Sequence, residues 1–190
     1  MCIRDSFNGL VAQFDLGTDL RGGVAVMNPV NNVYGNDGDF SIAAGVTYKE
    51  TTSLSYTSSD EQSFIDFKTA FDVSDNFNVK LNAHIADFGD DGSAFALGES
   101  FTSISAYPQI KSSDKMSWGM RLEYMMIDEA ITGDDLNVFS PTLTARYSVG
   151  ALTIVPELRL DSASEDIFTD NDGEAAGGLT AFNLAAVYTF

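Results

Sequence analysis

The sequence predicts an all-β, antiparallel up-and-down transmembrane β-barrel, seen as its C-terminal portion with about eleven strands visible. Two observations predict this fold. Segments of about ten residues alternate between apolar and polar side chains, and the connections between them alternate between short turns and longer polar loops. The mean hydropathy of −0.02 is compatible with this fold, because a barrel places only every second residue against lipid.

The last segment, residues 180–190, shows the alternation most simply. Phe182, Leu184 and Tyr188 share one side of the expected strand, whereas Asn183 and Thr189 share the other. The same two-residue period predicts further strands at residues 8–16, 20–27, 40–48, 52–58, 64–73, 77–86, 103–111, 118–127, 139–148 and 152–161.

The connections predict which end of each strand faces which side of the membrane. The short ones are residues 16–19, 49–51, 74–76, 112–115 and 149–150, and the longer ones are residues 28–39, 59–62, 87–100, 128–136 and 162–178. Bacterial barrels have short periplasmic turns, long outer loops and an even number of strands. We therefore expect a barrel domain over residues 7–190 that is incomplete at its N-terminus and lacks an odd number of strands. Residues 1–6 are interpreted as a non-native leader, such as a sequencing scar.

Composition excludes several other classes. No run of about 18 apolar residues is present, which excludes an ordinary transmembrane helix. The formal net charge of −18 argues against nucleic-acid binding, because such a surface repels phosphates. The single cysteine, Cys2, excludes an intrachain disulfide and a cysteine-built zinc site.

The aromatic side chains favour lipid contact over a soluble β-sandwich, which would show the same alternation. In phase with the strands, the apolar positions nearest the short turns are Tyr48, Phe71, Phe77, Trp118, Tyr147 and Phe190. Those nearest the long loops are Phe40, Phe101, Phe139 and Phe182. Two aromatic girdles at the membrane interfaces are typical of barrels in lipid. A soluble or surface-attached β-sandwich binding module, such as an adhesin, remains the alternative.

The opposite side of the strands carries charges in mid-strand, which a water-filled lumen tolerates at little cost. We predict that they line a pore: Lys68, Lys80, Arg121, Glu123, Arg146, Glu157 and Arg159. Charges of both signs around a lumen set a transverse field and bias which solutes pass. An equally weighted alternative, compatible with the first, is that they form internal ion pairs that stiffen the wall.

Acidic residues gather in the longer loops and are predicted to form a negative mouth. They include Asp90, Asp91, Asp134, Asp135, Asp170 and Asp172. Such a mouth concentrates cations within about 8–10 Å at physiological salt, so we expect a weak cation preference. The alternative is a solvated face that prevents aggregation. Residues 170–174 resemble a calcium loop only partly, since the full ligand spacing is missing, and no metal site or cofactor is expected.

His84, the only histidine, is the one candidate catalytic base. Its phase places it on the polar side beside Asn82 and Lys80, with no matched serine. We therefore expect no enzyme, and treat a barrel lipase as the least favoured function.

Several segments resemble the OmpL-like β-barrel porins of Bacteroidetes-like Gram-negative bacteria. The resemblance rests on TLTARYSVGALTIVPELRLD (residues 142–161), SDKMSWGMRLEYM (residues 113–125) and FNLAAVYTF (residues 182–190). Residues 24–38 also resemble a strand and loop of that family, although Pro29 after Asn28 departs from its pattern.

The resemblance implies an outer-membrane porin that allows passive diffusion of small hydrophilic solutes or ions and contacts outer-membrane lipid. It also implies insertion by the barrel-assembly machinery, because Phe190, Tyr188, Ala186 and Leu184 are similar to the terminal signal that this machinery reads. Porins are often trimers, so a homo-oligomer is an open alternative.

Overall fold

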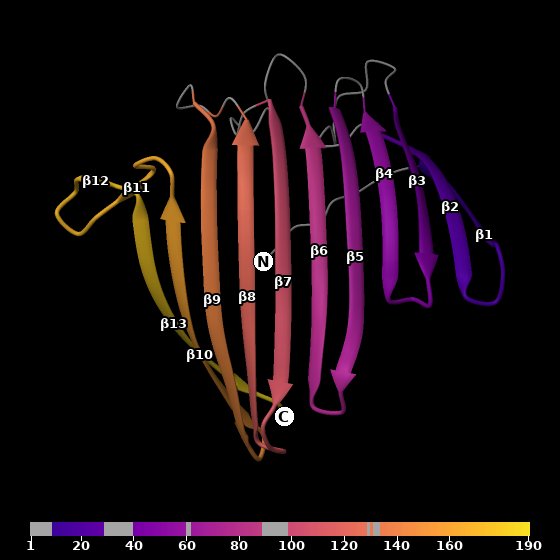
Figure 1. Cartoon of the computed structure of the whole chain (residues 1–190). Coiled ribbons are helices and arrows are strands. Elements are labelled where there is room, and N and C mark those ends of the chain that lie inside the picture. Colours follow the sequence, from indigo (N-terminus) through magenta and orange to yellow (C-terminus); the bar gives the residue numbers. More distant parts are fainter. Residues whose placement is uncertain (1–8, 29–39, 60–61, 89–98, 129, 131–133) are drawn as a thin grey trace.

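The computed structural model describes residues 9–28, 40–59, 62–88, 99–128, 130 and 134–190. Within them the chain forms one antiparallel sheet of 11 strands, in which each strand pairs with its neighbour in sequence until β10 pairs with β13. The strands are β1 (Gly9–Asp15), β2 (Leu20–Met27), β3 (Ser41–Tyr48), β4 (Thr52–Ser59), β5 (Gln62–Ser74), β6 (Phe77–Asp87), β7 (Ser100–Lys111), β8 (Met116–Asp128), β9 (Leu136–Val149), β10 (Leu152–Ala163) and β13 (Gly178–Tyr188). Figure 1 shows these strands running up and down in a single curved layer, with the short turns at one end.

The up-and-down topology and the eleven sheet strands agree with the predicted fold class. Among the described residues the sheet is not closed, because β1 and β13 each pair on one side only. The described part of the chain contains no second sheet of comparable size, so the β-sandwich alternative is wrong. No helix in the described residues has the length and hydropathy to cross a bilayer.

The last long connection contains two strands that the periodicity did not predict. β11 (Phe168–Thr169) and β12 (Ala175–Ala176) form a two-stranded hairpin that projects beside the end of β13 (Figure 1). Strands of two residues are too short to show an alternating pattern. The hairpin turn is made by Gly173, whose positive φ of 84° suits a residue without a side chain.

Three prolines lie inside strands, and the ladder is interrupted on one side of each. Pro108 pairs with Val79 of β6, and the β7–β8 register skips Pro108 between Ala106 and Gln109. Pro156 and Pro141 likewise pair on one side and coincide with gaps in the β9–β10 register. Proline has no N–H to donate, so it is tolerated where one side of the ladder is already open.

The polar side of β2, β3 and β4 carries small side chains. Gly23 lies directly opposite Gly45, which lies opposite Ser55. A Cβ on Gly45 would come within 3.2 Å of the Leu54 backbone oxygen and 3.3 Å of the Ser55 Cβ, so this close approach favours glycine. Other small residues on this side of the three strands are Ala25, Ala43, Ser41, Ser53 and Ser59, whereas Arg21 is a long one.

Candidate pore-lining surface

Polar and apolar side chains are buried and exposed on the two sides of the sheet in the reverse of the pattern of a soluble protein. The polar side, called here the polar face, holds all of the buried polar and charged residues of the described chain: Ser41, Ser59, Ser103, Ser105, Ser140, Thr142 and Asp161. The opposite side, the apolar face, exposes large side chains such as Leu143 (43%), Leu158 (42%) and Leu184 (65%). Water disfavours so much exposed apolar surface, so this face requires an apolar surrounding.

The polar face is hollowed over β6 to β10. One hollow, of about 850 Å³, is lined by residues of these strands and of the β5–β6 turn, including Asn78, Gln109, Arg121, Thr144, Arg146 and Arg159. A second hollow, of about 400 Å³, shares Tyr107 and Gln109 with the first and extends toward β5. The curvature of the sheet therefore places the polar face on its inner side.

Cross-strand register orders the polar face into rows. The basic row contains Lys80, Tyr107, Arg121, Thr142 and Arg159, from β6 to β10. Three of its five members are cations and none is an acid. Neighbouring strands are spaced about 4.8 Å apart, so consecutive cations of the row lie roughly 10 Å from each other at the backbone.

Ion pairs connect part of this row to acids in the next row. Arg121 pairs with Glu123 at 3.5 Å, and Arg159 pairs with Asp161 at 2.8 Å. Asp161 also accepts a hydrogen bond from the Ser140 hydroxyl. Each of these two ion pairs therefore lies within a single strand, β8 or β10.

The remaining predicted lining charges lie on the same face with other partners. Lys68 contacts Asp66 of its own strand at 3.5 Å, and the Glu157 carboxylate accepts a hydrogen bond from Thr144 at 3.0 Å. Lys80 and Arg146 have no ion pair within the described residues. Of the five basic residues predicted to line the pore, these two are thus the ones without an ion pair in the described part of the chain.

The outer end of the polar face is apolar, which the sequence analysis missed. Phe64, Ala86, Phe101, Ile127 and Leu136 lie directly opposite one another across β5 to β9 and form the outer apolar row. Ala130, from the connection after β8, packs in the same cluster as Ile127 and Leu136. Phe88, from the connection after β6, lies with its ring centroid 6.1 Å from that of Phe64.

The prediction that Phe101 belongs to the outer aromatic girdle is therefore wrong. Its side chain shares a face with Ser103 and Ser105, and its ring centroid is 5.9 Å from that of His84. The apolar face of β7 is instead carried by Thr102, Ile104 and Ala106, which pair with apolar-face residues of β8.

His84 lies in a second row, between Asp66 of β5 and Ser103 of β7. The expectation that no serine lies beside His84 is thus wrong, because Ser103 is its cross-strand partner. Its Nδ1 is 3.7 Å from an Asp66 carboxylate oxygen, and its ring stacks on Phe64 with centroids 6.2 Å apart. No hydrogen bond joins His84 to Ser103, so the nucleophile–base contact that catalysis requires is not formed.

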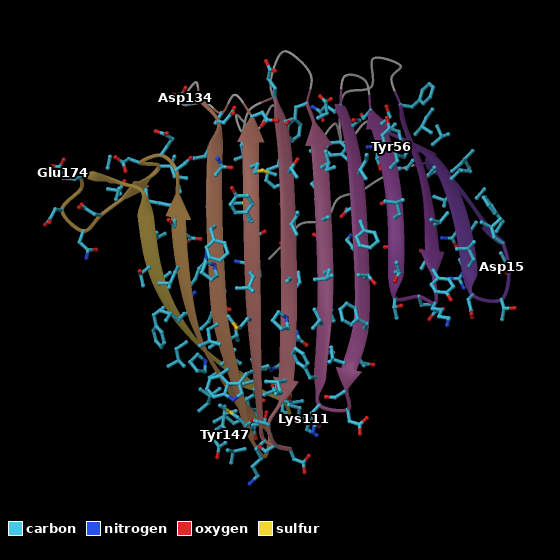
Figure 2. The ribbon with its side chains drawn as sticks, in the orientation of Figure 1. Asp15, Tyr56, Lys111, Asp134, Tyr147 and Glu174 are labelled. Atoms are coloured by element: carbon cyan, nitrogen blue, oxygen red, sulfur yellow. The ribbon has the colours of Figure 1, made fainter. Side chains whose placement is uncertain are left out.

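The predicted acidic mouth is described only in part. Asp134 lies among the longer connections and Glu174 in the projecting hairpin (Figure 2). The Asp170 carboxylate accepts backbone N–H groups of Asp172 and Glu174, each at 2.9 Å, and so caps the hairpin turn. No group of three or more candidate metal ligands occurs in the described part of the chain. Asp90 and Asp91 lie outside the described residues.

At the other end of the sheet, the side chains predicted for the periplasmic interface of the membrane lie near the short turns. Tyr147 and Lys111 mark this end in Figure 2. Four of them are 41–48% exposed on the apolar face: Trp118, Tyr147, Tyr48 and Phe71. Of the other two, Phe77 begins β6 and Phe190 follows β13. In the β7–β8 turn, the Lys111 ammonium donates to Asp114 at 2.9 Å, which holds the pKa of that carboxyl below its usual value.

An apolar outer face, a charged and hollowed inner face and an up-and-down meander together define the wall of a β-barrel channel. The chain belongs to the family described as "Putative beta-barrel porin-2, OmpL-like", whose model matches residues 6–190. This finding confirms the family resemblance seen in the sequence.

A solved structure shows the same fold. The chain is similar to the outer membrane channel DcaP of Acinetobacter baumannii, with a TM-score of 0.65 and 13% sequence identity. The match covers 96% of this chain and 62% of that channel, so the present chain spans less than two thirds of the channel's length. A comparison with curated protein sequences found no match.

Proposed function

We propose that this chain forms part of the wall of an outer-membrane porin in a Gram-negative bacterium, through which small hydrophilic solutes or ions diffuse passively. The observation that carries the proposal is the inverted burial: serines and an aspartate are buried on the inner face, while leucines and aromatic residues are exposed on the outer face. This order suits a sheet with lipid on one side and water on the other. Membership of a porin family supports the same conclusion.

In this proposal the polar face lines the pore, and the aromatic residues near the short turns contact the lipid headgroups. No bond is made or broken, because the described rows offer charges and hydroxyl groups but no nucleophile activated by a base. Homo-oligomer formation belongs to the same proposal, and the mass of the detergent-solubilised complex tests it.

Planar-bilayer recording tests the function. The purified protein is expected to insert and to carry stepwise, ohmic ionic currents in symmetric potassium chloride. Liposomes that contain it should swell in small sugars and not in large dextrans. Insertion without any current, over many independent bilayers, would contradict the porin proposal.

The acidic loops are proposed to give the pore a weak preference for cations. Replacing Asp134, Asp135 and Asp172 by asparagine should lower the ratio of potassium to chloride permeability, because negative charge at the mouth concentrates cations within about a Debye length. The measurement is the reversal potential in a potassium chloride gradient. Asp170 is left unchanged, since its carboxylate caps the hairpin turn. An unchanged reversal potential would remove the role of the loops.

A further inference from the structure

The two hollows on the polar face gather basic residues out of proportion to the composition of the chain. The larger is lined by Lys111, Arg121, Arg146 and Arg159, and the smaller by Lys68 and Lys80. The linings thus hold six of the chain's 10 basic residues but, in Asp75 and Glu157, only two of its 28 acidic ones. Acids pair with four of the six cations, Lys68, Lys111, Arg121 and Arg159, so within the described part of the chain the unpaired basic residues of the two hollows are Lys80 and Arg146.

We propose that the larger hollow is a binding site for small solutes that carry an oxyanion, such as a phosphate or carboxylate group. The inference rests on the proposed function only in that such solutes would reach the site through the lumen. A guanidinium group offers paired N–H donors whose spacing matches two oxygens of an oxyanion. Arg146 lies four residues along β9 from Thr142, which pairs with both Arg121 and Arg159. The three arginines therefore offer such donors at different points along the hollow.

Arg146 is the residue on which the site depends most. Arg121 and Arg159 each share their charge with an acid of the neighbouring row, Glu123 and Asp161. Arg146 is exposed and has no ion pair within the described residues, so its five N–H donors are available to a solute. Glu157, on the adjoining strand, also lines the hollow and accepts a hydrogen bond from the Thr144 hydroxyl.

The neutral polar groups of the hollow fit the same class of ligand. Tyr107, Gln109 and Asn78 line it beside the arginines and can donate hydrogen bonds to oxygen atoms. The hollow, of about 850 Å³, is large enough for a sugar phosphate or a short organic acid together with its bound water. We expect weak binding, because a site within a diffusion path must also release its solute.

Calorimetric titration of the detergent-solubilised full chain tests the site. Glucose 6-phosphate and inorganic phosphate are expected to bind, whereas glucose, which lacks the charge, is not. Arg146→Gln should weaken phosphate binding about tenfold, and Arg146→Lys should weaken it less, because the charge remains but the paired donors are lost. Higher sodium chloride concentrations should weaken binding to the wild type.

Arg21→Gln is the matched control. Arg21 is also an arginine on the polar face, but it lies in β2, outside both hollows, and contacts Asp15 and Glu50. Its replacement should leave phosphate binding unchanged. The proposal is overturned if Arg146→Gln binds phosphate as tightly as the wild type, if Arg21→Gln loses as much affinity, or if glucose binds as well as glucose 6-phosphate.

Bilayer recording separates this inference from the proposed function. If the pore conducts, phosphate should reduce the chloride current in the wild type at lower concentrations than in Arg146→Gln. If the protein carries no current but still binds phosphate through Arg146, the porin function fails and the oxyanion site stands. If it conducts and phosphate neither binds nor blocks, the site fails and the porin function stands.

Discussion

At the residue scale, Asp161 shows how the polar face accommodates a buried charge. Its side chain is 3% exposed, pairs with Arg159 at 2.8 Å and accepts the Ser140 hydroxyl. A buried carboxylate is tolerated only when its oxygens have such partners. The pair also holds the Arg159 side chain in place along the basic row.

Replacing Asp161 by alanine should therefore destabilise the folded chain. The Arg159 guanidinium would lose its partner and the Ser140 hydroxyl its acceptor, at a cost of about 1–3 kcal/mol in the free energy of unfolding. This range allows for the partial exposure of Arg159 to water. Urea unfolding in lipid vesicles, followed by tryptophan fluorescence, measures the change. Asp72→Ala, on the same face but exposed, is the control and should stay within about 0.5 kcal/mol.

The sequence predicted the side occupied by every proposed lining charge, because each lies within a long alternating run. It failed at Phe101, where the expected strand began three residues late and the alternation was weak. Phe101 lies outside the expected strand, so the alternation within that strand did not determine its side. The register with Ala86 and Ile127, which reveals the outer apolar row, depends on pairing between strands and is not visible in one strand alone.

At the element scale, β9 offers a direct comparison of the two faces. Leu143 and Thr144 are neighbours near the middle of the strand, and their side chains point to opposite sides. Leu143 is exposed on the apolar face, whereas Thr144 contacts Glu157 on the polar face. If the apolar face meets lipid, the two positions should tolerate a charge very differently.

Leu143→Arg should destabilise the folded protein in vesicles by about 2–4 kcal/mol, the cost of a cation at the lipid face near the bilayer midplane. Thr144→Arg should cost far less, because the new guanidinium would lie in water beside Glu157. The free energy of unfolding of both variants is compared under the same conditions. Equal costs at the two positions would remove the distinction between a lipid face and a water face.

Strand existence was predictable from periodicity, whereas the interruptions within strands were not. A proline in mid-strand removes a ladder donor, and the paired structure places a register gap beside each of the three prolines. Which side of a strand can lose a hydrogen bond depends on the neighbouring strand. A single sequence therefore shows the proline but not the gap that accommodates it.

At the scale of the whole molecule, the chain end is proposed to guide assembly. Phe190 follows β13 and is exposed. Deleting Phe190 should lower the amount of folded protein in the outer membrane, because recognition of the last strand is impaired. The folded fraction is the part that migrates differently on a gel before and after heating. A matched deletion variant refolded in detergent should keep its heat-modifiable migration, which separates assembly from stability.

The fold class and topology of the whole chain were predictable, since they need only alternating strands and alternating connection lengths. The arrangement of the charges was only partly predictable from the sequence. Lys80, Arg121 and Arg159 are far apart in the sequence, and only the cross-strand register places them in one row. The concentration of cations in the hollows therefore emerged from the structure, although each cation was already assigned to the correct side.

The stretch of glycine, alanine and serine on β2 to β4 has a consequence for how the pore could be re-engineered. Long side chains project from β6 to β10, while Gly23, Gly45 and Ser55 scarcely rise above the backbone. The width of the proposed pore and its charge thus depend on different strands of the same sheet. Bulkier neutral residues on the polar side of β2 to β4, at Ser55 for example, would lower the permeability to large molecules and leave every arginine in place.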